Sequence, residues 1–234
     1  MDISGEQLLE VFANYNAQIW PMQIVAYVLG VVCVLFAFRK AKWAARIVLG
    51  VLSFFWFWVA LMFWLPSASQ GFSIGYAFIA LFLVEGVLLI IQTVKPKLAF
   101  GTSSSGDTIA GLIMILYAMV GYPLFGMLIG HVYPQTPPFG LTPCPLIIFT
   151  FGIFLLAKTK IPLLLLAIPF FYGLSGVIWV SKGIWEDLGM VLTSLVAGYL
   201  ILVRNQQLNR EPDISEMSRD SAAWSLDISE TGKR

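Results

Sequence analysis

The chain has 234 residues, of which 59% are hydrophobic and only 12% are charged. A soluble domain has roughly 45–50% apolar and about 25% charged residues, so this composition excludes a soluble globular protein and predicts one integral membrane domain. The formal net charge of +1 provides no basic surface for nucleic acid, and we expect no such partner. Two cysteines and one histidine are too few for a disulfide framework or a thiolate metal site, so we expect no metal and no cofactor.

Seven apolar runs follow one another along the chain, and a membrane-spanning helix needs roughly 20 apolar residues. The runs cover residues 17–38, 44–65, 72–94, 108–130, 144–157, 161–180 and 185–203. We therefore predict an all-α membrane protein with seven transmembrane helices. The fifth run has only about 14 residues, and segments of that length are often re-entrant or interfacial.

Lysine and arginine residues gather in alternate loops, as they do in short cytoplasmic loops of membrane proteins. They are Arg39, Lys40, Lys42 and Arg46, then Lys95 and Lys97, then Lys158 and Lys160. This pattern predicts that the N-terminus lies outside and the C-terminus lies in the cytoplasm. It also favours a full, proline-interrupted span for the fifth run, because the last pair of lysines would otherwise lie outside.

The chain then divides into three parts. Residues 1–16 form a short acidic outer N-terminus, residues 17–203 form the seven-helix domain, and residues 204–234 form a cytoplasmic tail. No basic residue precedes the first apolar run, so we expect a retained anchor rather than a cleaved signal peptide. The charged, serine-containing tail predicts disorder.

Glu85 lies near the middle of the third run and is the only ionisable residue deep within any run. An acid at this depth costs roughly 2.5–3.5 kcal/mol on insertion scales and usually faces the helix bundle or a wet cavity. Gln92 follows two helical turns later on the same face. Glu85 and Gln92 are therefore candidates for a polar path. The alternative, which weighs equally, is a buried carboxyl that joins neighbouring helices by hydrogen bonds.

The segment 121–145 contains the candidate residues of an outer mouth, namely Tyr122, His131, Tyr133, Phe139 and Cys144. Its prolines and glycines predict a shaped loop beside a broken helix, which is the kind of element that marks transporter binding sites. A rigid cap over the helix ends is the alternative interpretation. Cys33 and Cys144 are predicted to lie at opposite membrane depths and to be free thiols. Glu186 and Asp187 are interpreted as caps at the start of the seventh helix.

Two stretches resemble a known family. They are GYPLFGMLIGHVYPQTPPFGLTPCPLIIFTFGIFLL, with its ordered GHxYP, FGLTPCP and IFTFG motifs, and KIPLLLLAIPFFYGLSG followed by WEDLG. Over most of residues 10 to 203 the chain resembles a bacterial family of multi-pass membrane proteins of unknown function. The resemblance implies a location in the bacterial cytoplasmic membrane and implies no established activity.

These observations lead to two hypotheses. The first is a small-solute or ion transporter, or a channel-like protein, whose polar path passes Glu85. The second is a membrane scaffold or subunit that does not transport and binds a partner protein. Motifs of catalytic nucleophiles, metalloproteases and phosphate loops are absent from the sequence, so we expect no enzyme. The expected partners are the lipid bilayer, a small polar solute or ion, and either a second copy or another membrane protein.

Overall fold

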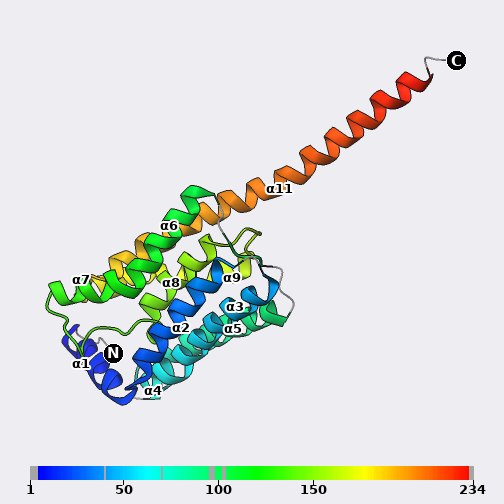
Figure 1. Ribbon diagram of the computed structural model, residues 1–234. Helices are drawn as coiled ribbons and strands as arrows, with labels where there is room; N and C mark the ends of the chain where they lie inside the picture. Colours follow the sequence, from blue (N-terminus) through cyan, green and yellow to red (C-terminus); the bar gives the residue numbers. More distant parts are fainter. Residues whose placement is uncertain (1–4, 40, 70, 95–97, 102–103, 232–234) are drawn as a thin grey trace.

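The computed structural model describes residues 5–39, 41–69, 71–94, 98–101 and 104–231, and within these ranges the regular structure is helical. A single isolated bridge joins Phe100 and Ala157 in that part of the chain. The helices are α1 Gly5–Gln18, α2 Met22–Ala37, α3 Lys42–Trp58, η1 Val59–Trp64, α4 Leu65–Ser69, α5 Gly75–Val94, α6 Ser105–Leu116, η2 Tyr117–Gly121, α7 Tyr122–Leu128, α8 Pro143–Leu155, α9 Leu163–Leu174, α10 Gly176–Val180 and α11 Asp187–Thr231 (Figure 1).

Five helical segments are long and apolar enough to cross a membrane. Three of them contain several elements: η1 and η2 are π-helical turns that continue the neighbouring α-helices in two segments, and α9 and α10 follow each other in a third. The five segments are Trp43–Ser69, Gly75–Val94, Ser105–Leu128, Leu163–Val180 and Asp187–Arg210. They coincide with the second, third, fourth, sixth and seventh predicted runs. The chain is an all-α, multi-pass membrane protein.

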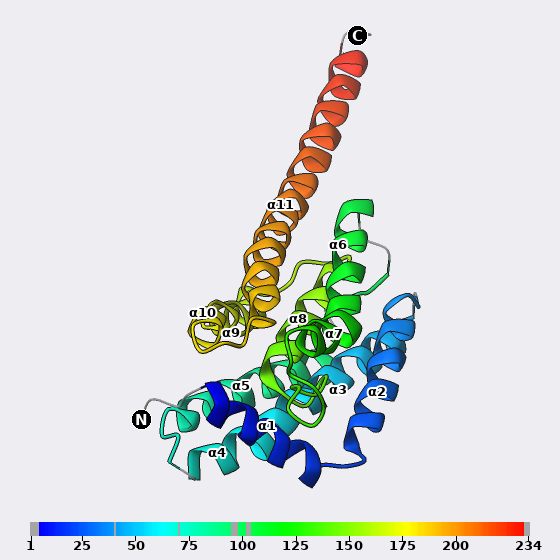
Figure 2. The ribbon, with the colours of Figure 1, turned by 90° about the vertical axis from the view of Figure 1, so that its left-hand side faces the viewer.

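The first predicted run, 17–38, corresponds mainly to α2, and most of α1 precedes it, in residues assigned to the N-terminus. Helices α1 and α2 meet at an angle of 87°. If this bent pair is counted as one span, the number of candidate spans rises from five to six. Pro21 precedes α2 and cannot donate a backbone hydrogen bond, which is why a new helix begins there. Helix α1 lies across one end of the molecule (Figure 2) and buries Leu8, Phe12 and Tyr15.

The fifth predicted run forms α8, whose 13 residues are all buried inside the protein. At about 1.5 Å per residue this helix is roughly 20 Å long, which is shorter than a hydrocarbon core of about 30 Å. It contacts α6 and α11 most closely. By length and composition five helical segments, or six with the bent pair, are candidate spans in the described part of the chain, and the count of seven crossings stays a prediction. Hydrophobicity alone suggested a further span because enclosure by other helices selects the same apolar residues as lipid does.

The two ends of the molecule can be named after residues of α11. At the Arg204 end, the Arg204 guanidinium donates hydrogen bonds to the carbonyls of Phe154 and Leu155, at 3.0 and 3.1 Å. It also lies 3.5 Å from the Asp107 carboxylate. The backbone N–H of Lys158 donates to Ala99 at 2.7 Å at the same end. Lys40, Lys95 and Lys97, on which the orientation also depends, lie outside the described residues.

Helix α11 continues to Thr231, well past residue 204 where the separate tail was expected to begin. Its last turns project away from the other helices (Figure 1). The assignment of residues 204–234 to a cytoplasmic tail stays a prediction. The other end of the molecule, the Asp187 end, contains α1, the segment 129–142 and the start of α11 (Figure 2).

Candidate functional site

The start of α11 places two acidic side chains inside the protein. Glu186 is 0% exposed and Asp187 is 1% exposed. The preceding turn ends at Gly183, whose φ of +96° favours glycine because L side chains rarely adopt it. The positive end of the helix dipole stabilises a carboxylate at this position. Helix capping therefore explains part of the arrangement, but burial of both acids calls for polar partners.

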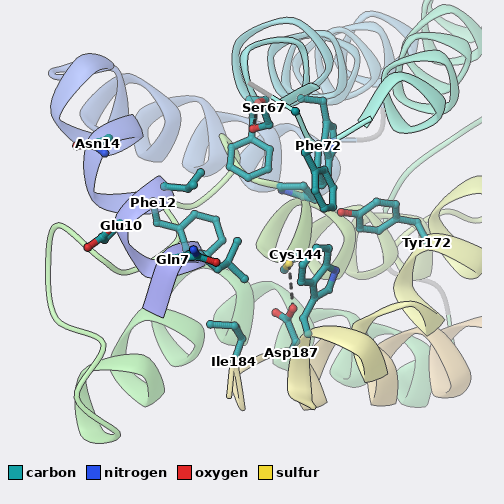
Figure 3. A pocket seen from close by; sticks show the side chains of 17 residues that line it. Gln7, Glu10, Phe12, Asn14, Ser67, Phe72, Cys144, Tyr172, Ile184 and Asp187 are labelled. Atoms are coloured by element: carbon teal, nitrogen blue, oxygen red, sulfur yellow. Dashed lines mark hydrogen bonds between the residues drawn. The ribbon is translucent and has the colours of Figure 1, made fainter. Parts of the chain in front are cut away.

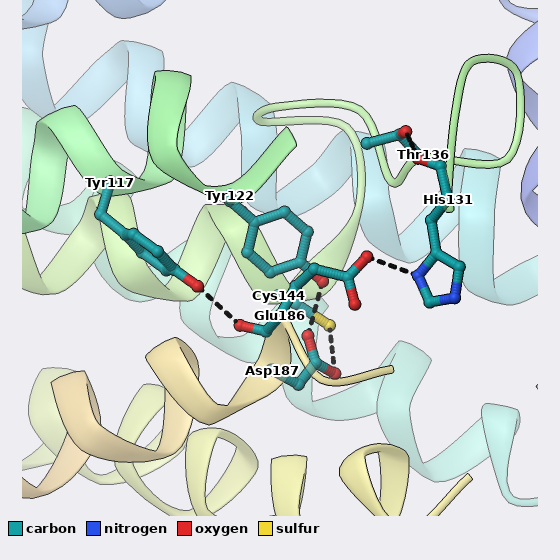
Figure 4. Close-up of polar contacts among 7 residues, drawn as sticks. All are labelled: Tyr117, Tyr122, His131, Thr136, Cys144, Glu186 and Asp187. Atoms are coloured by element: carbon teal, nitrogen blue, oxygen red, sulfur yellow. Dashed lines mark hydrogen bonds and ion pairs between the residues drawn. The ribbon is translucent and has the colours of Figure 1, made fainter. Parts of the chain in front are cut away.

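Asp187 receives hydrogen bonds on both carboxylate oxygens. The Tyr122 hydroxyl donates to Oδ1 at 2.6 Å, and the Cys144 thiol donates to Oδ2 at 3.2 Å (Figure 4). The three side chains come from α11, α7 and α8, so helices far apart in the sequence meet at one carboxylate. Two donors suit an ionised acid, since a carboxylate only accepts hydrogen bonds.

Glu186 forms a second polar group beside the first. Its Oε1 lies 2.7 Å from Nδ1 of His131, and its backbone carbonyl accepts a hydrogen bond from the Tyr117 hydroxyl at 2.9 Å (Figure 4). A Cβ atom at Gly126 would lie 2.7 Å from the same Oε1, so the close approach of α7 requires glycine. The Thr136 hydroxyl donates to the His131 carbonyl.

The proline-rich segment that follows His131 is held in place by α1. The Asn16 side-chain amide donates to the carbonyls of Pro134 and Thr136 at 2.7 and 2.8 Å. The Tyr15 hydroxyl donates to the Leu141 carbonyl at 2.7 Å. These bonds fix a shaped loop, as expected from its composition, and both α1 and the loop cover the Asp187 end.

A pocket of about 410 Å³ opens at this end between α1, the α4–α5 connection and the start of α11 (Figure 3). Cys144 and Asp187 lie deep in it, whereas the exposed Glu10 and Asn14 of α1 lie at its rim. Its wall contains six aromatic side chains, namely Phe12, Phe63, Trp64, Phe72, Tyr172 and Trp179. The volume lies within the roughly 300–1,000 Å³ usual for small-molecule sites.

Three of the five expected mouth residues gather around the acidic pair, namely Tyr122, His131 and Cys144. The other two do not. Tyr133 is 62% exposed on the loop surface. Phe139 is buried in the core, where its ring packs against Tyr27, Phe55 and Phe149 at centroid distances of 5.0–5.9 Å. Neither residue lines the pocket.

Glu85 and Gln92 lie on α5, away from the pocket lining. Glu85 is 0% exposed, and neither of its carboxyl oxygens has a hydrogen-bond partner among the described residues. The same holds for Oε1 of Gln92. Phe82, one turn before Glu85, packs at 5.0 Å against Tyr172 of the pocket wall. The polar path through Glu85 and Gln92 stays a prediction.

Sequence reasoning missed the part that Glu186 and Asp187 play in the site. Two adjacent acids at the start of an apolar run are the signal that was present, and capping is the simplest explanation of that signal. Their burial against Tyr122 and Cys144 depends on helix packing.

Cys33 and Cys144 are both buried free thiols, as predicted. The residues that the structure describes contain no group of three His, Cys, Asp or Glu side chains that could hold a metal ion.

Comparison with known proteins gives one match. The sequence model of a family of unknown function, DUF6064, matches residues 5–212. No curated protein and no solved structure matches the chain significantly. The match confirms the expected membership of a family without established function.

Proposed function

The chain belongs to the DUF6064 family of unknown function, and we propose that this protein moves a small solute or ion across the membrane by way of its pocket. The observation on which this proposal depends is a pocket of about 410 Å³ with a buried carboxylate, Asp187, at its inner end. A concave, largely apolar site with a few convergent polar groups is the usual form of a small-molecule site.

The position of Glu85 supports a route from the pocket towards the Arg204 end. The ring of Phe82 packs between Tyr172 of the pocket wall and Trp56, at centroid distances of 5.0 and 4.5 Å. Glu85 lies one turn beyond that ring, and Gln92 lies about 10 Å further along α5. Phe82 would then separate the pocket from the polar path, and movement of its ring would connect them.

We further propose seven membrane crossings, with the N-terminus outside and the C-terminus in the cytoplasm. The contacts of α8 favour counting it as a crossing element enclosed by the other helices. Cys144, near its start, meets Asp187, and the carbonyls of Phe154 and Leu155, at its end, meet Arg204. Asp187 and Arg204 are separated by about 25 Å of helix.

The Asp187 end would then face outwards, because Lys158 and Arg204 lie at the opposite end. We propose the bacterial cytoplasmic membrane as the location and the lipid bilayer as the constant partner. In this proposal the protein is not an enzyme.

A second candidate function is a scaffold that binds a partner protein. It is favoured by α11, which extends beyond the other helices as far as Thr231 (Figure 1). A projecting helix offers a surface to a partner protein or to a second copy. The two functions differ in whether Glu85 matters, because a scaffold needs no polar path.

The test is flux of protons and ions into proteoliposomes under an imposed pH gradient and membrane potential. We expect flux with the unaltered protein and its loss in Glu85→Gln. Glu6→Gln is the control, because it removes a charge from an exposed position of α1. Flux that is equal in Glu85→Gln would contradict the path. Absence of flux above that of empty liposomes would overturn ion transport and favour the scaffold.

A further inference from the structure

We propose that the pocket at the Asp187 end selects organic cations, that is, ligands with one positive centre on an apolar body. This inference rests on the proposed function only in taking this pocket as the binding site, and it names the class of ligand. Two features of the pocket lead to it: its aromatic wall and the sign of its charge.

The aromatic wall is continuous from α1 to α10. Phe12 stacks on Phe63 at 5.8 Å, and Phe63 meets Trp64 at 5.0 Å. Phe72 lies 5.9 Å from Trp64 and 6.2 Å from Trp179. Faces of tryptophan, tyrosine and phenylalanine attract cations that approach within about 6 Å of the ring centroid. Groups of such rings are the usual means by which proteins hold quaternary ammonium groups.

The charge of the lining has one sign. Among the described residues that line the pocket, Glu10 and Asp187 are acidic and none is Lys, Arg or His. Within the same part of the chain, Glu186 is paired with His131, whereas no cationic side chain forms an ion pair with Asp187. A buried carboxylate that has hydrogen bonds but no cation is poorly compensated. A bound cation would supply the missing charge, and an anion would be repelled.

The same features argue against other ligand classes. A small inorganic cation prefers several oxygen ligands, and the deep part of the lining offers one carboxylate beside a thiol. An anionic solute would have to lie against Asp187 without a basic group in the lining. An uncharged apolar solute would fill the aromatic space and leave the carboxylate uncompensated.

The first test is calorimetric binding to the full chain in detergent, with benzyltrimethylammonium as the probe and benzylsulfonate as its anionic counterpart. We expect the cation to bind and the anion not to bind. Asp187→Asn should weaken cation binding at least about tenfold, and Glu6→Gln, which removes a charge outside this pocket, should not change it. Equal binding of both probes, no binding of either, or an affinity that Asp187→Asn leaves unchanged would each overturn the inference.

A second measurement needs no change at Asp187 and so remains decisive if Asp187→Asn fails to fold. Cys144 lies in the pocket, and Cys33 is buried elsewhere. In a Cys33→Ala background, the Cys144 thiolate displaces methanesulfinate from a methanethiosulfonate and forms a mixed disulfide. The trimethylammonium reagent should modify Cys144 at least about tenfold faster, relative to their rates with a free thiol, than the sulfonate reagent. Equal relative rates would overturn the inference.

Failure of this inference can be distinguished from failure of the proposed function. Binding of the cation without flux of protons, inorganic ions or the cation itself in proteoliposomes would retain the ligand class and overturn transport. Flux that depends on Glu85, in a protein that does not bind the cation, would retain transport and overturn the ligand class.

Discussion

Replacement of Tyr122 by phenylalanine tests the site directly, because it removes one hydroxyl and leaves the ring in place. That hydroxyl donates to Oδ1 of Asp187 at 2.6 Å, and both side chains are fully buried. The phenylalanine ring fills nearly the same space, so the packing of Tyr122 against Tyr117, at 6.2 Å between centroids, should persist. The substitution therefore isolates one hydrogen bond to a buried carboxylate.

The expected loss of stability depends on the Asp187 carboxylate, which remains buried after the hydroxyl is removed. A hydrogen bond to a charged group contributes about 1.5–3 kcal/mol, and the oxygen left behind cannot reach water. The Cys144 thiol still donates to the other oxygen of Asp187 at 3.2 Å, so the acid keeps one donor. We expect Tyr122→Phe to lower the free energy of unfolding by about 2 kcal/mol.

The buried free thiol of Cys33 provides the assay. A dye that becomes fluorescent on reaction with thiols reports unfolding in detergent through Cys33, which is 0% exposed and lies outside the pocket, so that it reacts only when the helices separate. Tyr199→Phe is the control: it makes the same change on the same bundle, at a side chain that is 68% exposed. Its effect should stay within about 0.5 kcal/mol.

A Tyr122→Phe variant as stable as the Tyr199→Phe control would refute the reasoning. It would mean that Asp187 is hydrated or protonated differently, or that α7 and α11 do not meet at this point. A loss that disappears when Asp187→Asn is already present would support the pairing, because the two residues would then be energetically coupled.

Three further predictions use the same unfolding assay. Gly111→Ala should cost about 1–3 kcal/mol, because its Cβ would lie 2.8 Å from a backbone oxygen of α8; Gly106→Ala in the same helix meets nothing within 4 Å and should be neutral or slightly stabilising. Arg204→Met should cost about 3 kcal/mol, since the end of α8 loses two buried hydrogen bonds. Gly189→Ala should destabilise because its Cβ would overlap the Tyr117 ring. An unaffected Gly111→Ala, Arg204→Met or Gly189→Ala would contradict the corresponding helix contact.

Hydrophobicity predicted the helices well where an apolar run is long enough to cross the bilayer. The second, third, fourth, sixth and seventh runs match the five long spans to within a few residues at most of their ends. It failed to distinguish α8 from a lipid-exposed helix, because burial by α6 and α11 requires the same apolar residues as burial by lipid. It also missed α1 and the 87° angle between α1 and α2, because α1 is too polar to stand out as an apolar run.

The candidate site was only partly predictable. Tyr122, His131 and Cys144 were found as polar or reactive residues at the ends of apolar runs. Phe139, which the same loop contains, belongs to the core. Asp187 was interpreted as a helix cap, since a sequence indicates where a helix begins but not which side chains of other helices surround its first turn.

The sequence by itself determined that the chain is an all-α membrane protein, because the length and composition of each run must match the bilayer whatever the run packs against. Only the tertiary structure decided that Asp187 meets Tyr122 and Cys144, 65 and 43 residues away in the chain. It also decided that α1 and the start of α11 enclose an aromatic pocket beside them. These contacts depend on how the helices pack against one another, and a pattern of local hydrophobicity contains no information about distances between helices.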